Sequence, residues 1–308
     1  MADDLFADTG PEGRNRDSQK FERQLRRLSD TLGWKVLDCN VDVWLSDDQK
    51  DAAGVDLIIA YRDPQHSHQN DGWLLEGKRH DGPGRYTSKQ IGDEVQRLRK
   101  KVASLDGKKR FTEHERVRPH VDRLVGGVLA HYSADYDAAK ARNALEGMTL
   151  SGHSFGVDPL RIAYLGPDTL NGLAEAFDLT GDPNEFLWPV SMNAEQKWSP
   201  VCPPDQLAAG LLAWRTGTQT VMWLRDTLEH ADIPALERIA RVWGISFDLV
   251  VVTELTQEKL ARLRATWEEV ASDSQKDQGP GQLPKEIRAL ELTNANMREF
   301  NKRWPDAE

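Results

Sequence analysis

The sequence has few cysteines and no long apolar run. Cys39 and Cys202 are the two cysteines among 308 residues, and such isolated residues form neither a zinc knuckle nor a disulfide framework. We expect two reduced, partly buried thiols. No apolar run reaches the ~18 residues that suggest a membrane span, and residues 1–20 lack the apolar stretch of a signal peptide. We therefore expect a cytoplasmic protein without a membrane partner.

Basic residues are in deficit over the whole chain. The 40 Lys and Arg stand against 50 Asp and Glu, which gives a net charge of −10 and argues against nucleic acid as a partner. Residues 76–123 reverse this balance, with fourteen Lys and Arg against eight Asp and Glu, a local charge of +6. Because the distribution of charge matters more than its sum, a nucleic-acid partner stays open.

Composition shifts divide the chain into three parts. Residues 1–19 are predicted to be a disordered tail, because glycine and proline interrupt any helical pattern. Residues 181–204 contain several prolines and few periodic apolar residues, which is typical of a boundary. The sequence thus predicts a domain over 20–180 and a C-terminal α/β domain over 181–308.

The first domain is predicted to have the order helix, strand, strand, strand, helix, strand. The first helix carries an apolar stripe at Phe21, Leu25, Leu28 and Leu32. Period-2 or short apolar segments predict strands over 34–45, 55–61, 73–78, 124–131 and 160–165, with helices starting near Thr87 and over 135–145. This order favours an α/β sandwich around a mixed sheet. The short connections predict that its first three strands are largely antiparallel.

The C-terminal half is predicted to be mostly helical. Apolar periodicity favours helices around 205–228 and 233–243, and one strand over 247–252. A final helix, about 284–303, follows a linker rich in glycine and can dock on the body or on another protein.

Charged residues interrupt two consecutive apolar strands. Asp56 lies within Gly54-Val55-Asp56-Leu57-Ile58-Ile59, and Glu76 and Lys78 lie in the next strand. A carboxylate inside an apolar strand is unfavourable unless it is paired or binds a metal. Glu76 and Lys78 are two residues apart and therefore share a face. If the strands pair, Asp56 meets Glu76 and a divalent cation relieves their repulsion.

Asp56, a spacer and Glu76-Gly77-Lys78 resemble the Asp…Glu-x-Lys signature of the PD-(D/E)XK phosphodiesterase superfamily. Restriction endonucleases, junction resolvases and RecB-like nucleases belong to it. Val55 stands where the family has a proline before the aspartate. The resemblance covers roughly residues 20–165 and implies a restriction endonuclease-like core, with a mixed central sheet flanked by helices.

The resemblance also implies roles for these residues. Asp56, Glu76 and the backbone carbonyl of Gly77 would coordinate Mg²⁺ or Mn²⁺. Lys78 would orient or activate the attacking water and stabilise negative charge on the phosphate.

Two further positions fit the family. Glu22 stands on the first helix, where many members carry a glutamate, although a surface charge is the alternative interpretation. Gln90 matches a glutamine on the helix after the signature, although it can also be the capping-box partner of Thr87. RecB-like members place a tyrosine four residues after this glutamine, and Glu94 stands there in this sequence.

Basic residues near the signature are candidates for contacts with backbone phosphates. The alternative is a solvated helix face. The candidates are Arg79, Arg85, Lys89, Arg97, Lys100 and Lys101.

Together these observations predict a Mg²⁺-dependent DNA nuclease that acts as a restriction or anti-phage defence effector, as a homodimer or with a partner protein subunit. One alternative is a catalytically silent PD-(D/E)XK scaffold that binds nucleic acid or a protein partner. Another is an unrelated α/β protein in which Glu76 and Lys78 form a structural ion pair. Dependence of activity on metal separates the first hypothesis from the other two.

Overall fold

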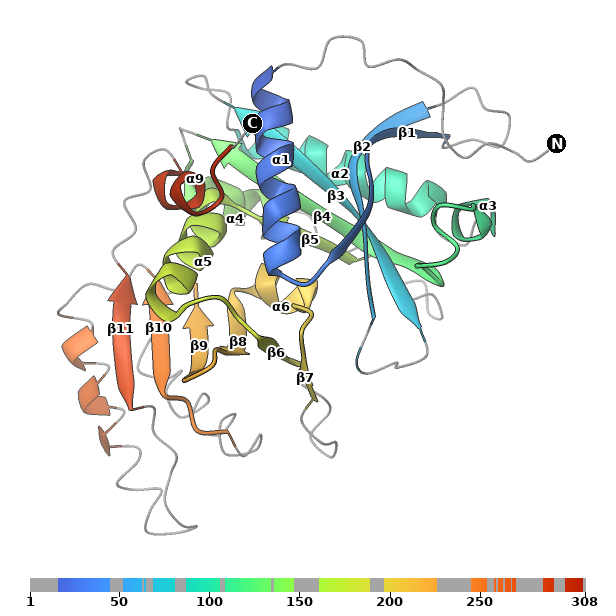
Figure 1. The fold of residues 1–308 in the computed structure, drawn as a ribbon. Helices are drawn as coiled ribbons and strands as arrows, with labels where there is room; N and C mark the ends of the chain where they lie inside the picture. The colour runs from blue at the N-terminus through green and yellow to red at the C-terminus, as the bar shows by residue number, and fades with distance from the viewer. Residues whose placement is uncertain are drawn as a thin grey trace. The chain divides into compact units, whose positions relative to one another are not determined.

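The computed structural model divides the chain into two compact units (Figure 1). One comprises Met1–Pro167 with Asn294–Glu308, and the other comprises Asp168–Thr293. The described residues are 16–44, 52–62, 64, 69–80, 87–105, 109–133, 136–146, 161–188, 197–225, 245–253, parts of 258–269, 285–290 and 297–306. Most of the predicted tail and the predicted helix over 233–243 lie outside these ranges.

The first unit contains a five-stranded mixed sheet with the order β1-β2-β3-β4-β5. The β1/β2 and β2/β3 pairs are antiparallel, and the β3/β4 and β4/β5 pairs are parallel. The predicted α/β fold class with a mixed central sheet is therefore confirmed. Its elements are α1 (Arg16–Thr31), β1 (Lys35–Trp44), β2 (Ala52–Arg62), β3 (Asn70–His80), α2 (Ser88–Leu105), α3 (Lys109–Glu113), β4 (Arg123–Ser133), α4 (Ala138–Glu146), β5 (Arg161–Leu165) and α9 (Arg298–Arg303).

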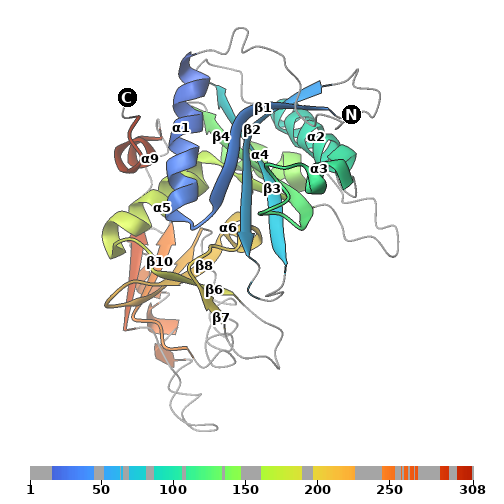
Figure 2. The same ribbon diagram turned by 45° about the vertical axis from the view of Figure 1, so that its right-hand side comes forward.

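Helices α1 and α2 cover opposite faces of this sheet (Figure 2). A Cβ added to Gly77 of β3 would lie 2.7 Å from Leu25 Cδ1 of α1, and one added to Gly127 of β4 would lie 2.8 Å from Leu98 Cγ of α2. The two glycines therefore let the helices approach the strands closely. Since side chains alternate along a strand, Glu76 and Lys78 point away from α1 and towards α2.

The C-terminal segment of the chain packs on α1. The Gln24 side chain donates hydrogen bonds to Asn301 Oδ1 at 2.9 Å and to the Trp304 carbonyl at 2.8 Å. The indole of Trp304 donates to Thr31 Oγ1 at 3.1 Å. Residues nearly 280 positions apart in sequence thus belong to one unit.

The second unit contains a six-stranded sheet with the order β11-β10-β9-β8-β6-β7. Strands β9, β10 and β11 are parallel neighbours, and the remaining pairs are antiparallel. The elements are α5 (Pro167–Thr180), β6 (Glu185–Trp188), β7 (Lys197–Ser199), α6 (Pro204–Ala209), β8 (Leu211–Arg215), β9 (Thr220–Leu224), β10 (Leu249–Thr253) and β11 (Glu286–Leu290).

Two helices predicted for the C-terminal half are wrong. The helix expected over 205–228 ends at Gly210, whose φ of +72° suits glycine, and β8 and β9 follow as an antiparallel pair. In place of a helix over 284–303, β11 pairs with β10, and of the residues described in this range Arg298–Arg303 are helical. Both segments bury apolar side chains against neighbouring strands, which overrides their helical periodicity. Trp214 and Trp223 are core residues, as expected.

Within the described residues, no helix is both long and apolar enough to cross a membrane. Cys39 is half-buried and Cys202 is buried, and both are free thiols, as predicted. Burial raises the pKa of the Cys202 thiol well above its usual value.

Candidate active site

The antiparallel pairing of β2 with β3 brings Asp56 next to the Glu76-Gly77-Lys78 segment. Leu57 pairs with Leu75 in this register, and the backbone N–H of Gly77 donates to Asp56 Oδ2 at 2.8 Å. Glu76 is 2% exposed. The carboxylates therefore come from neighbouring strands and are largely withdrawn from solvent.

Lys78 extends from this buried site towards solvent. Its Nζ lies 3.2 Å from Glu76 Oε2, and its side chain is 32% exposed, whereas that of Glu76 is 2% exposed. Glu76 is therefore not a solvent-facing residue at the edge of the sheet. The ammonium group of Lys78 can reach a ligand at the surface while its stem stays in the site.

A second lysine reaches Glu76 from α2. The Lys101 ammonium donates to Glu76 Oε1 and, at 2.6 Å, to the carbonyl oxygen of Gly54. The sequence predicted Lys101 as a phosphate contact within a basic run, whereas in the structure it is turned inwards. The missed signal is its spacing, because Lys101 follows Leu98 by three residues and so shares the buried stripe of α2.

The buried charges of this site perturb one another. Burial raises the pKa of Asp56, although Lys78 and the Gly77 N–H act in the opposite direction. Burial would lower the pKa of Lys78, but the charges of Glu76 and Asp56 raise it above the usual value. A buried carboxylate with a raised pKa is stabilised in its charged form by a bound cation. The oxygen donors of Asp56 and Glu76 fit a hard divalent cation.

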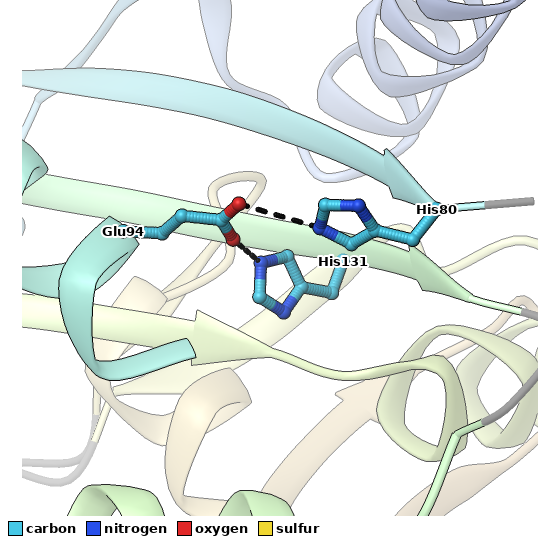
Figure 3. Close-up of side chains that lie close together, drawn as sticks. All are labelled: His80, Glu94 and His131. Atoms are coloured by element: carbon cyan, nitrogen blue, oxygen red, sulfur yellow. Dashed lines mark hydrogen bonds and ion pairs between the residues drawn. The ribbon is translucent and has the colours of Figure 1, made fainter. Parts of the chain in front are cut away.

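A second cluster lies on the same face of β3, and its members His80, Glu94 and His131 are shown in Figure 3. His80, two residues beyond Lys78, lies with its Nε2 3.3 Å from Glu94 Oε1 of α2. His131 of β4 lies with its Nε2 2.5 Å from Glu94 Oε2. In the parallel register of β3 and β4, His131 pairs with Lys78. The carboxylate of Glu94 therefore bridges two imidazoles beside the lysine of the signature.

The cluster is electrostatically coupled. Burial opposes ionisation of Glu94, but hydrogen bonds from His131 and His80 lower its pKa to about 2. Burial lowers the pKa of His131 below its usual value, although Glu94 opposes this shift. In the sequence, Glu94 stands where RecB-like members have a tyrosine, and no role was predicted for it. Its position in the buried stripe with Ile91 and Leu98 was the available signal.

Gln90 lies at the edge of this second cluster. Its side-chain Nε2 is 3.3 and 3.4 Å from the two ring nitrogens of His80. Its backbone N–H donates to Thr87 Oγ1 at 3.2 Å, so the predicted cap of α2 is present. Gln90 thus combines a structural position at the start of α2 with a side chain directed to His80.

The structure places Glu22 and Arg79 on the other face of the sheet. Glu22 is a buried residue of α1, the helix that packs on Gly77. Arg79 stacks on Tyr132, with its Cζ 4.2 Å from the ring centroid, and Tyr132 contacts Phe21 of α1 edge to face. Neither residue therefore belongs to the face that presents Glu76 and Lys78.

The remaining predicted phosphate contacts lie on α2 or outside the described residues. Lys89, Arg97 and Lys100 are exposed on α2, which leaves them accessible to a polyanion. Arg85 lies in a segment that the structure does not describe.

The helix–strand–strand–strand–helix–strand order, with Asp56, Glu76 and Lys78 gathered on β2 and β3, defines a fold of the PD-(D/E)XK nuclease class. The family described as "GAPS4 protein PD-(D/E)XK nuclease domain" matches residues 11–168, just over half of the 308 residues, and the chain belongs to it. The superfamily resemblance is therefore confirmed. No curated protein and no solved structure matches the chain.

Proposed function

We propose that this protein is a Mg²⁺-dependent nuclease that hydrolyses phosphodiester bonds of DNA. The observation that carries the proposal is the pair of carboxylates of half-buried Asp56 and buried Glu76 beside the ammonium of Lys78, which lies 3.2 Å from Glu76. PD-(D/E)XK nucleases generally use divalent metals, and an oxygen donor set favours Mg²⁺ or Mn²⁺ over softer ions.

Asp56, Glu76 and the backbone carbonyl of Gly77 would hold the ion. A bound divalent cation would supply a Lewis acid and a water of lowered pKa. The N–H of Gly77 fixes Asp56, so this carboxylate is held in place before a ligand arrives. Lys78 would donate to a phosphate oxygen and stabilise its developing negative charge. In the metal-free protein Lys101 holds the Glu76 side chain in a fixed orientation, and a cation bound by Glu76 would displace this ammonium.

The exposed basic residues of α2 support a nucleic-acid substrate. Lys89, Arg97 and Lys100 would contact backbone phosphates, which carry affinity without sequence information. Of the two further candidates that the family pattern suggests, Gln90 lies at the start of α2 beside His80, whereas Glu22 lies with α1 on the other face of the sheet. Cleavage of both strands of a duplex would favour a homodimer, and we propose a restriction or anti-phage defence role, alone or with a partner subunit.

The test is a cleavage assay with the full chain. Linear duplex DNA, circular duplex DNA, single-stranded DNA and RNA are incubated with Mg²⁺, Mn²⁺ or EDTA, in parallel with Glu76→Gln. We expect DNA cleavage that requires metal and is lost in Glu76→Gln. Cleavage of RNA alone would contradict the proposed substrate, and cleavage that persists in EDTA would contradict the proposed chemistry. A folded protein that binds DNA without cutting it would favour the silent scaffold.

A further inference from the structure

The second cluster has the geometry of a metal site. One ligand atom each from His80, Glu94 and His131 lies within 4.8 Å of the other two, and the three residues come from β3, α2 and β4. With metal–ligand distances of ~2.0–2.1 Å, the ligand atoms around a tetrahedral ion lie roughly 3.3 Å apart. The distance between His80 Nε2 and Glu94 Oε1 is 3.3 Å. His131 Nε2 lies 2.5 Å from the other carboxylate oxygen, Oε2, so an ion held by both imidazoles would take both oxygens of Glu94 or a small rotation of its side chain.

The donor set differs in kind from that of the nuclease carboxylates. Two imidazole nitrogens and one carboxylate oxygen suit zinc and other first-row transition metals, whereas Mg²⁺ takes oxygen ligands almost exclusively. Asp56 and Glu76 offer only oxygen. The two clusters would therefore select different ions although they lie on the same face of one strand.

An outer group holds the imidazole of His131 in place. The hydroxyl of Tyr164 lies 3.0 Å from Nδ1 of His131. Metal-binding histidines commonly hydrogen-bond through their second nitrogen, which fixes the tautomer and the ring orientation. Because a tyrosine hydroxyl both donates and accepts, Tyr164 can accept from Nδ1–H and leave Nε2 as a ligand.

We propose that His80, Glu94 and His131 form a binding site for one first-row transition-metal dication of the zinc type. Three protein ligands leave a fourth position for water or a substrate oxygen. Because His131 is the strand partner of Lys78, the ion would add positive charge beside the phosphate-facing lysine. Metal binding at this site does not depend on the proposed nuclease function.

Metal content of the full chain tests the proposal. The protein is stripped with a chelator, exchanged into buffer, incubated with Zn²⁺ and desalted, and retained zinc is measured by mass spectrometry. Co²⁺ loading gives a second readout, since tetrahedral Co²⁺ absorbs visible light. Wild type should retain one ion per chain, whereas His80→Ala and Glu94→Gln should retain none. Tyr164→Phe, which removes only the hydroxyl, should weaken zinc binding ~10–100-fold.

Two further variants locate the ion. His120→Ala removes a histidine outside the cluster, one that contacts Lys35, and should retain zinc like wild type. Asp56→Asn should also retain zinc, because it alters only the nuclease carboxylates. The proposal is overturned if wild type retains no zinc, or if His80→Ala and Glu94→Gln retain as much as wild type. Loss of zinc in Asp56→Asn together with retention in His80→Ala would place the ion at the nuclease carboxylates instead.

Discussion

The two faces of β3 carry opposite chemistry. Gly77 faces α1, where Phe21 and Leu25 pack closely on the strand. Glu76, Lys78 and His80 face α2, which contributes a lysine and a glutamate that pair with them. One strand therefore belongs both to an apolar core and to a charged site. Under the proposed function the α2 face would carry the active site, so substitutions at its charged residues and substitutions on the α1 face should separate activity from stability.

The largest effect is expected on the charged face, from Lys78→Ala. Removing the ammonium should reduce the cleavage rate ~10²–10³-fold, as loss of one preorganised donor does in other active sites. Lys140→Ala is the matched control, because this lysine of α4 is exposed and pairs only locally with Asp137 at 3.6 Å. Single-turnover kinetics measure both variants. Equal cleavage rates for Lys78→Ala and Lys140→Ala would show that Lys78 is not an active-site residue.

Leu25→Ala tests the apolar face. The side chain is completely buried, and its truncation should lower the free energy of unfolding by ~2–5 kcal/mol. Denaturant titration measures this loss. Below the melting temperature, the folded variant should cleave DNA at nearly the wild-type rate. A loss of cleavage without a loss of stability would show that the α1 face contributes to activity and not to stability.

Lys101→Met tests the contact of α2 with Glu76. The variant leaves Glu76 with one partner fewer, which should destabilise the metal-free protein by ~1–3 kcal/mol. Mn²⁺ should restore more stability to this variant than to wild type, because the ion then has no competing ammonium at Glu76. Thermal unfolding with Mn²⁺ and with EDTA measures this difference.

Lys100 is exposed and precedes Lys101 directly, so Lys100→Ala is compared with Lys101→Met for DNA binding. It should weaken DNA binding and reduce the salt slope by about 0.9. If Lys101→Met lowered the slope equally, Lys101 would be a phosphate contact after all.

The smallest effect is expected from Asp56→Asn in the absence of metal. Because the pKa of Asp56 is raised in the folded state, the folded protein holds its proton to a higher pH than the unfolded chain. Stability is then lost as pH rises from the usual aspartate pKa of 3.8 through the folded pKa. The variant lacks this loss and should melt at a higher temperature than wild type at neutral pH.

Melting curves in EDTA near pH 4 and near pH 8 check the sign. The two proteins should converge at the lower pH. A variant that melts lower than wild type at the higher pH would show that the Asp56 carboxylate stabilises the metal-free fold.

The nuclease signature was predictable because its spacing is local. Glu76 and Lys78 are two residues apart on one strand, and Asp56 lies on the preceding antiparallel strand, so a short-range pattern specifies all three. The apolar stripe of α1 was equally local, and Phe21 and Leu25 are buried as expected.

The partners of this site were harder to predict, because they depend on long-range geometry. Placing His131 beside Lys78 requires the parallel register of β3 and β4, strands about fifty residues apart. Directing Lys101 to Glu76 requires the rotation of α2 about its own axis. Neither quantity follows from local periodicity.

The errors in the second unit have a related cause. Residues 211–224 contain two short apolar runs with three leucines and two tryptophans, and such runs fit a helix or a buried strand equally well. These runs form strands because β8 pairs with β9 and β9 pairs with β10.

The most direct test of the central claim is a crystal structure of the full chain with Mn²⁺, located by its anomalous scattering. The account predicts an anomalous peak bridging the carboxylates of Asp56 and Glu76, which disappears in Asp56→Asn while the fold is retained. A DNA-cleaving protein whose Mn²⁺ is bound elsewhere, with Lys101 still on Glu76, would contradict it.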